Sequence, residues 1–139
     1  MELISTHPVR KSDLGFHGNL FGGQLLQWVD LAALAYATQC CDTPRMVTAT
    51  MDSVFVRPAK EGQVIKIYAD ILDIGNKSIT LKIEARSHDV YDGEQNVVSD
   101  SKCVFVRVNE ENKPIPISDR VKLKFGFKTI DDITIPTRK

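Results

Sequence analysis

A glycine-rich segment that runs directly into a helix is the part of this sequence best suited to chemistry. Residues 17–24 read His-Gly-Asn-Leu-Phe-Gly-Gly-Gln, and a segment rich in leucine and alanine follows. Gly22 and Gly23 allow a ligand to approach the backbone, and the first turn of a helix leaves N–H groups without intrahelical partners. With the positive end of the helix dipole, those donors suit an oxygen that gains negative charge in a reaction. The two glycines would also suit close packing of a helix on a sheet, so they do not decide the matter alone.

Asp30 is a second candidate, because it lies in the third turn of the same helix, between Val29 and Leu31. A buried carboxylate is costly unless it is paired or used. Gln24, Gln27 and Asp30 share one side of the helix, and on an ordinary amphipathic helix such a polar stripe would simply face solvent. Here almost every other side chain is apolar, so we favour a functional carboxylate.

The distance between these candidates indicates a site shared by two chains. At about 1.5 Å per residue, Asp30 lies roughly 12 Å along the helix from Gly22. Asn19 and the helix N-terminus therefore cannot easily meet Asp30 of their own chain. Two antiparallel helices from two subunits would bring each N-terminus near the Asp30 of the other. If these residues form one site, the protein is a homo-oligomer.

The elements that must position these residues are predicted from periodicity and turn signals. One long helix covers residues 22–41 and is closed by Asp42 and Pro44. Tight turns such as Glu61-Gly62 and Gly75-Asn76 separate the later strands. Strands are expected at residues 3–9, 46–56, 63–72, 78–86 and 97–108. Tight turns imply antiparallel pairing, so the predicted fold class is α+β, a sheet wrapped around a single helix.

Composition excludes several classes of partner. The chain has 139 residues, with 18 Lys plus Arg against 18 Asp plus Glu, so no net charge attracts nucleic acid or an anionic membrane. No apolar stretch approaches the roughly 20 residues that cross a bilayer, and the N-terminus has no signal-peptide pattern. We expect no nucleic-acid or membrane partner and a cytoplasmic location.

The cysteines and histidines predict neither disulfides nor a metal site. Cys40, Cys41 and Cys103 are odd in number and lack metal-ligand spacing, so we expect three packed thiols in a reducing compartment. His17, beside a glycine, is a weak candidate for an acid–base group. We therefore expect no metal and no cofactor.

The segment from Gly18 to Asp30, Gly-Asn-Leu-Phe-Gly-Gly-Gln-Leu-Leu-Gln-Trp-Val-Asp, resembles the signature of the hotdog-fold acyl-CoA thioester hydrolases. These are broad-specificity bacterial enzymes and their vertebrate tandem-domain relatives. Further similarities follow in order, at residues 47–49, 55–58, 62 and 75–78. The resemblance covers about residues 1–110. It implies one hotdog acyl-CoA hydrolase domain over 1–110, followed by a C-terminal tail over 111–139 that matches nothing in the family.

The resemblance implies hydrolysis of acyl-CoA to free acid and coenzyme A by a domain that dimerises edge to edge, often as a trimer of dimers. Asp30 would act as general base or nucleophile. Asn19 would come from the opposite subunit and orient the water or the carbonyl. Gly22 and Gly23 would polarise the thioester carbonyl.

The resemblance also implies where coenzyme A binds. Lys77 and Ser78 would lie where the family holds coenzyme A, in the turn after the third strand. Arg57, in the Phe-Val-Arg-Pro sequence that ends the second strand, is a further candidate for this contact. The strand from Thr48 to Pro58 is one residue shorter than is usual in the family. The acyl chain length is left open.

Two alternatives remain open. A hotdog hydratase or dehydratase acting on acyl thioesters would pair a histidine with a carboxylate, and His17 with Asp30 could mimic that pair. A non-catalytic acyl-CoA-binding sensor domain would not need Asp30. Release of free thiol from acyl-CoA separates these alternatives from a hydrolase.

Overall fold

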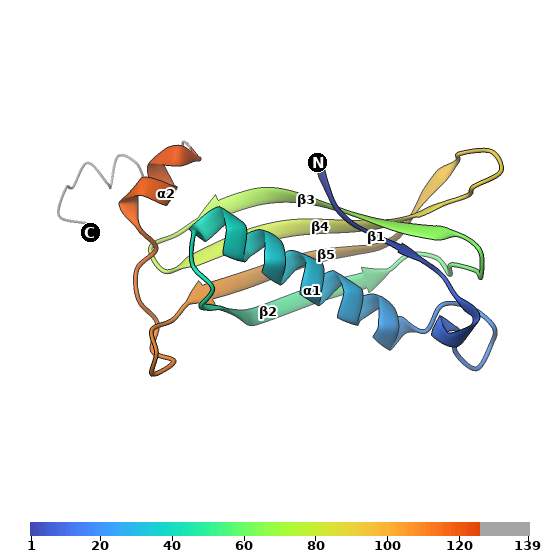
Figure 1. Cartoon of the computed structure of the whole chain (residues 1–139), viewed down its shortest axis with the longest axis horizontal. Coiled ribbons are helices and arrows are strands. Elements are labelled where there is room, and N and C mark those ends of the chain that lie inside the picture. The colour runs from blue at the N-terminus through green and yellow to red at the C-terminus, as the bar shows by residue number, and fades with distance from the viewer. Residues whose placement is uncertain (126–139) are drawn as a thin grey trace.

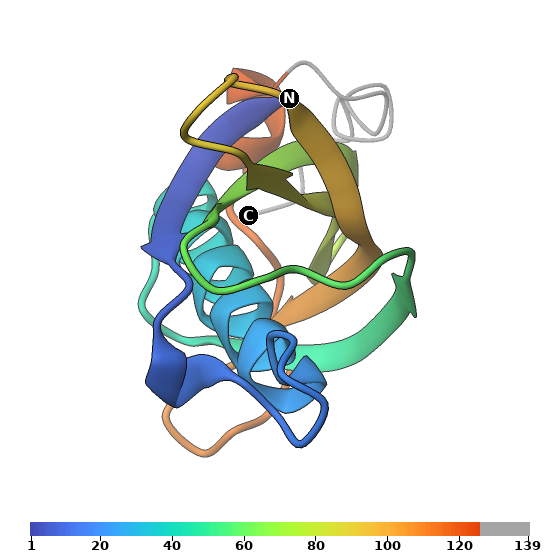
Figure 2. The same cartoon turned by 90° about the vertical axis from the view of Figure 1, so that its right-hand side faces the viewer.

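The structure of the protein, a computed structural model, describes residues 1–125. Figure 1 shows one long helix lying along a sheet of long strands. The elements are β1 (Glu2–Pro8), a 3-10 turn η1 (Lys11–Asp13), α1 (Gly22–Cys41), β2 (Met46–Phe55), β3 (Val64–Ile74), β4 (Ser78–His88), β5 (Gln95–Arg107) and α2 (Asp119–Lys124). All five strands belong to one antiparallel sheet. The sheet curves around one side of α1 (Figure 2), which confirms the predicted α+β class.

Helix α1 has the predicted bounds but is buried on one face only. Leucine, alanine and tryptophan side chains of that face pack against the sheet. Residues at four-residue spacing on the opposite face, including Leu31 and Ala35, are exposed, and Leu31 is 57% exposed. Although almost all side chains of the helix are apolar, the sheet covers only one side of it in the single chain. The helix ends at Asp42, whose backbone is left-handed (φ 53°) and whose N–H donates to the Thr38 carbonyl.

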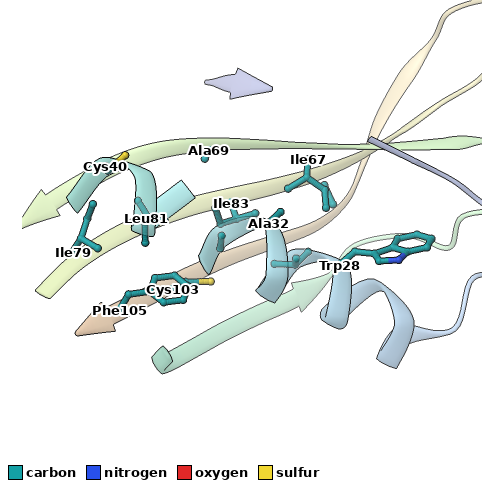
Figure 3. Close-up of a cluster of buried hydrophobic side chains, with 14 of the residues drawn as sticks. Trp28, Ala32, Cys40, Ile67, Ala69, Ile79, Leu81, Ile83, Cys103 and Phe105 are labelled. Carbon is teal, nitrogen blue, oxygen red and sulfur yellow. The ribbon is translucent and has the colours of Figure 1, made fainter. Parts of the chain in front are cut away.

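The core lies between α1 and the concave face of the sheet. The alternation predicted for β4 is confirmed, since every second side chain, Ile79, Leu81, Ile83 and Ala85, is fully buried. Figure 3 shows Ile79, Leu81 and Ile83 beside Cys103 and Phe105 of β5, on the side of the sheet that faces α1. Burial of this apolar face is the main contribution that holds the helix on the sheet.

The strand order, β1-β3-β4-β5-β2, corrects one expectation. Tight turns were expected between all the later strands, but β2 pairs with β5 and not with β3. The segment 56–63 therefore crosses from the edge strand β2 to β3, which lies next to the opposite edge strand, β1. It passes the loop that precedes α1, where Leu20 N donates to the Ala59 carbonyl at 2.8 Å. Glu61-Gly62 does form a turn, with a left-handed Gly62 (φ 89°), but a turn signal specifies only a local bend and not the partner of the next strand.

Residues after 110 pack on the same core as far as they are described. Ile117 and Val121 are fully buried and belong to the core cluster. The Ile117 N–H donates to the Asn76 carbonyl at 2.8 Å, and Lys122 Nζ donates to Asn76 Oδ1 at 3.1 Å. This segment thus rests on the turn between β3 and β4. The rest of the predicted tail lies outside the described residues.

Candidate active site

A cavity of about 440 Å³ opens at the N-terminus of α1. Its wall is built from the loop and first turn at the start of α1, from the end of β2 with its crossover connection, and from Val98 of β5. Among the residues that line the cavity are Asn19, Gly22, Leu25, Phe55, Arg57 and Val98. The cavity therefore joins an apolar wall to a polar edge of amide and guanidinium groups. Such a combination suits a ligand with an apolar tail and a polar reacting group.

Two backbone N–H groups are free at the start of α1, and Gly22, which carries one of them, lines this cavity. Phe21 is the N-cap and its side chain gives no capping hydrogen bond. Within residues 1–125, the N–H groups of Gly22 and Gly23 have no acceptor, whereas those of Gln24 and Leu25 bond to the Phe21 carbonyl. The predicted donors at the helix N-terminus are therefore present.

The glycines at the start of α1 also meet two aromatic rings. A Cβ added at Gly23 would lie 2.6 Å from the Phe21 ring, so that ring would have to move. A Cβ at Gly22 would lie 3.6 Å from the Phe55 ring, which is an ordinary contact. Close packing against Phe21 thus explains why residue 23 is a glycine. Packing does not require a glycine at position 22, and Gly22 lines the cavity. Helix packing and approach of a ligand, the two roles considered for this pair, therefore belong to different glycines.

Asn19 is held at the cavity by its loop. Its carbonyl accepts from the Gly15 N–H at 2.7 Å, and the next residue is bound to the crossover segment through Ala59. The Asn19 side chain is half-buried, and its Oδ1 accepts a hydrogen bond from Lys60 Nζ at 3.3 Å. Near Pro58, Lys60 looks like an ordinary charged residue at a strand end, and its contact with Asn19 could not be predicted because the two residues are 41 positions apart.

Asp30 lies further along α1 and is half-buried, not fully buried as expected. Its Oδ1 accepts a hydrogen bond from Thr48 Oγ1 at 3.1 Å. Thr48 lies near the start of β2, and it was not predicted as a site residue because its contact depends on how β2 lies against the helix. A carboxylate that keeps one hydrogen-bonded oxygen and some exposure can still accept a proton or attack a carbon.

The nearby thiol of Cys103 is not a nucleophile. Burial raises its pKa to about 11, and the neighbouring Asp30 carboxylate adds to the increase. Burial likewise raises the pKa of Cys41 to about 12 and raises that of Cys40. All three cysteines are buried and free, as expected for packed thiols. At neutral pH they remain protonated, and a thiol is a poor nucleophile compared with a thiolate.

Within one chain the structure brings only some of the predicted residues together. Asn19, Gly22 and Arg57 share the cavity, and the exposed Arg57 donates to Asn96 Oδ1 at 3.1 Å. Gly23 is exposed beside them. Asp30 is separated from Gly22 by roughly 12 Å of helix.

The Lys77–Ser78 turn lies at the other end of the sheet. Ser78 pairs with Val106 of β5, while Phe55, beside the cavity, pairs with Ser99. The seven residue steps from Ser99 to Val106 correspond to about 23 Å along a strand. The residues expected to bind coenzyme A therefore do not converge in a single chain.

The structure also bears on the expectations about His17, a metal site and a membrane-spanning helix. His17 is exposed and lies edge-on to Phe16, with no hydrogen bond to Asp30 in the described part of the chain. Among residues 1–125, no group of three His, Cys, Asp or Glu side chains is arranged to hold a metal ion. No helix of that same part is long and apolar enough to cross a membrane.

Known sequences and structures resemble this chain over most of its length. The profile of the thioesterase superfamily matches residues 17–94. The acyl-CoA thioester hydrolase of Salmonella typhimurium is 27% identical over 120 residues, covering 84% of this chain and 90% of the relative. The cytosolic acyl coenzyme A thioester hydrolase of the rat is 30% identical over 118 residues, covering 83% of this chain and 31% of that longer protein.

Two solved structures share the arrangement of helix and sheet. A hexameric hotdog-fold thioesterase of Campylobacter jejuni superposes with a TM-score of 0.79 at 31% identity, covering 91% of this chain and 98% of that one. A hexameric thioesterase of Yersinia pestis gives a TM-score of 0.79 at 27% identity, covering 85% and 96%.

Proposed function

The chain belongs to the thioesterase superfamily and is a thioester hydrolase of the hotdog fold, and we propose that it hydrolyses acyl-CoA to a free acid and coenzyme A. The observation that carries this proposal is the cavity at the N-terminus of α1. It offers the N–H of Gly22 and the amide of Asn19 beside an apolar wall. A thioester carbonyl bound there would face the donors, and an acyl chain would face the apolar wall.

The proposed reaction needs one base and no strong acid. A water oxygen attacks the carbonyl carbon, and the carboxylate of Asp30 of the partner subunit accepts the proton that the water loses. Gly22 and Asn19 donate to the oxygen that becomes negative. The carbon–sulfur bond then breaks, and the thiolate leaves readily because the pKa of a thiol is only about 8.5. In the alternative route, Asp30 attacks the carbonyl itself and water opens the resulting anhydride.

The two-chain site is supported by the surface of the single chain. Asp30 and Gly22 of one chain are too far apart to act on one bond, as the helix geometry requires. The edge strand β2 ends in the exposed apolar residues Val54 and Phe55, and the exposed Val56 follows directly. The solved thioesterases of Campylobacter and Yersinia are hexamers. We therefore propose a homo-oligomer built from dimers, in agreement with the sequence prediction of a trimer of dimers.

The proposed contacts to coenzyme A are also divided between two subunits. Arg57 lies at the cavity, but Lys77 and Ser78 lie about 23 Å away in their own chain. If they contact coenzyme A at this cavity, they must come from another subunit. We keep Lys77, Ser78 and Arg57 as proposed contacts for the nucleotide part of the substrate, with the first two supplied by a neighbour. The rat relative is named a cytosolic enzyme, which supports the proposed cytoplasmic location.

The first test is release of free thiol from a panel of short, medium and long acyl-CoA substrates, without metal or nucleotide. We expect steady thiol release with at least one substrate. A hydratase or dehydratase would change the acyl chain and leave the thioester intact, whereas a sensor domain would bind acyl-CoA without turnover. A folded protein that releases no thiol across the panel contradicts the proposed function.

The second test addresses the shared site. Asp30→Asn keeps the shape but removes the base, so kcat should fall by about 10²–10⁴-fold. Asn19→Ala should also lower kcat. After co-refolding of the two variants, a mixed dimer would contain one site with both defects and one intact site. Activity should then return to about a quarter of the wild-type value when subunits mix at random. If confirmed subunit exchange restores nothing, Asn19 and Asp30 do not act across an interface.

A further inference from the structure

Lys60 lies beside the side chain of Asn19 at the cavity, with its Nζ 3.3 Å from Asn19 Oδ1. A lysine ammonium is a donor only, so the atom of the amide that faces it must be the oxygen. The other end of the amide, Nδ2, donates to no acceptor within residues 1–125. The contact with Lys60 therefore decides which end of the Asn19 amide is offered to a ligand.

The main chain, and not only the lysine side chain, places these two residues together. Leu20 N donates to the Ala59 carbonyl at 2.8 Å, which fixes the loop of Asn19 on the crossover segment. Lys60 N in turn donates to Gln63 Oε1 at 2.8 Å, which fixes the backbone of the lysine. The crossover from β2 to β3 thus presents an ammonium group to a residue 41 positions earlier in the sequence.

We propose that Lys60 is a positioning residue that orients and polarises the Asn19 amide, so that Nδ2 donates to the thioester carbonyl oxygen. A hydrogen bond accepted by an amide oxygen strengthens the N–H of the same amide as a donor. The carbonyl oxygen then receives two donors, Asn19 Nδ2 and the N–H of Gly22. This inference rests on the proposed hydrolysis of acyl-CoA, in which Asn19 donates to the carbonyl oxygen, and it adds the residue that orients Asn19 for that contact.

A competing role for Lys60 is direct contact with a phosphate of coenzyme A, because ammonium groups commonly bind phosphates. The two roles differ in their dependence on the substrate. Acyl-pantetheine contains the thioester but no phosphate and no nucleotide. A lysine that positions Asn19 affects both substrates, whereas a lysine that binds phosphate affects acyl-CoA alone.

The experiment measures kcat and KM on acyl-CoA and acyl-pantetheine for the full-length chain. We expect Lys60→Met to lower kcat about two- to tenfold on both substrates with little change in KM, the range given by one net hydrogen bond. Lys60→Arg, which keeps a cationic donor, should restore most of the loss. Asn19→Ala should lower kcat by about 10²–10³-fold, and Lys60→Met should add nothing in that background.

Lys11→Met is the matched control, because Lys11 is an exposed lysine before the same loop and its ammonium makes no hydrogen bond or ion pair in the described part of the chain. Lys11→Met should have the kcat and KM of the wild type on both substrates. A loss confined to the KM for acyl-CoA would assign Lys60 to phosphate binding and overturn the inference. A Lys60→Met loss that persists undiminished in the Asn19→Ala background would also overturn it.

The failure of this inference is distinguishable from failure of the proposed function. If the wild-type protein releases no thiol, acyl-CoA hydrolysis itself is wrong. If the wild type is active and Lys60→Met has the same kcat on both substrates, the proposed hydrolysis of acyl-CoA stands and Lys60 does not position Asn19. Thermal unfolding of each variant checks that kcat is compared between folded proteins.

Discussion

The Asp30 carboxylate accepts a hydrogen bond of 3.1 Å from Thr48, which lies near the start of the edge strand β2. One carboxylate oxygen therefore has a fixed partner, and the half-buried position leaves the other oxygen reachable. A hydrogen bond to a charged acceptor is stronger than a neutral one and fixes its orientation. Because a general base must lie within hydrogen-bond reach of its water, we expect Thr48 to affect the rate through Asp30.

Replacing Thr48 by Val removes this donor and keeps the shape of the side chain. We expect kcat to fall about fivefold, corresponding to roughly 1 kcal/mol for an accessible hydrogen bond, with KM nearly unchanged. Thr50→Val makes the same chemical change nearby in β2, where the threonine is exposed and makes no side-chain hydrogen bond in residues 1–125, and should leave kcat as it is. Equal rates for Thr48→Val and wild type, with Asp30→Asn inactive, would show that Asp30 needs no such partner.

At the scale of the elements, a short turn before α1 sets where the helix begins. The buried Asp13 accepts hydrogen bonds from the backbone N–H of Arg10 at 2.9 Å and from its guanidinium at 3.1 Å. The Asp13 carbonyl accepts from Phe21 N, the residue immediately before Gly22. The η1 turn is thereby linked to the first turn of α1, where the free N–H groups of the cavity lie.

The same turn predicts a pH dependence of stability. The hydrogen bonds from Arg10 lower the pKa of Asp13 below its ordinary value of about 3.9. A carboxylate with a lowered folded-state pKa stabilises the fold above the unfolded-state pKa and loses this contribution as pH falls through the folded-state pKa. Asp13→Asn should therefore lower Tm at pH 7, and the difference from wild type should shrink below about pH 4. Asp73→Asn, at an exposed position of β3, should show no such trend.

The segment that follows β5 gives a second prediction for the elements. Ile117 is fully buried, whereas Leu123, in the same segment, is 54% exposed. Ile117→Ala should lower the free energy of unfolding by about 2–5 kcal/mol, and Leu123→Ala should change it little. Urea unfolding measures both. If Ile117→Ala has the same free energy of unfolding as the wild type, the result would support the predicted division at residue 110, with a domain that folds without the segment after it.

At the scale of the whole molecule, the surface of one chain is apolar where β2 ends. Val54 is 64% exposed, and its neighbours Phe55 and Val56 are also exposed. β2 is an edge strand, so one side of its backbone lacks a strand partner within the described residues. Exposed edge strands invite pairing with another chain, and a second copy would cover the apolar end and bring a second Asp30 to the cavity.

A charge at this edge should weaken the assembly and the reaction together. Val54→Lys should shift the sedimentation distribution toward the monomer, and thiol release should fall with the fraction of oligomer. Val90→Lys places the same charge at another exposed position, in the turn between β4 and β5, and should leave both unchanged. A Val54→Lys monomer with full activity would contradict the two-chain site.

The sequence by itself determined the helix, the alternating strand and the family. The bounds of α1 and the burial of every second residue of β4 follow from periodicity and from local stop signals such as Asp42. The segment from Gly18 to Asp30 carries the family signature because its residues lie close together along the chain. Such features depend on neighbours within a few residues, so they can be read without knowledge of the rest of the fold.

Only the tertiary structure decided which distant residues meet. Pairing of β2 with β5 sends the crossover past the helix N-terminus, and this places Lys60 beside Asn19. The same pairing places Thr48 beside Asp30 and leaves the Lys77 turn at the far end of the sheet. These contacts depend on the choice among strand partners, which is made by the packing of the whole core and not by any single turn or strand.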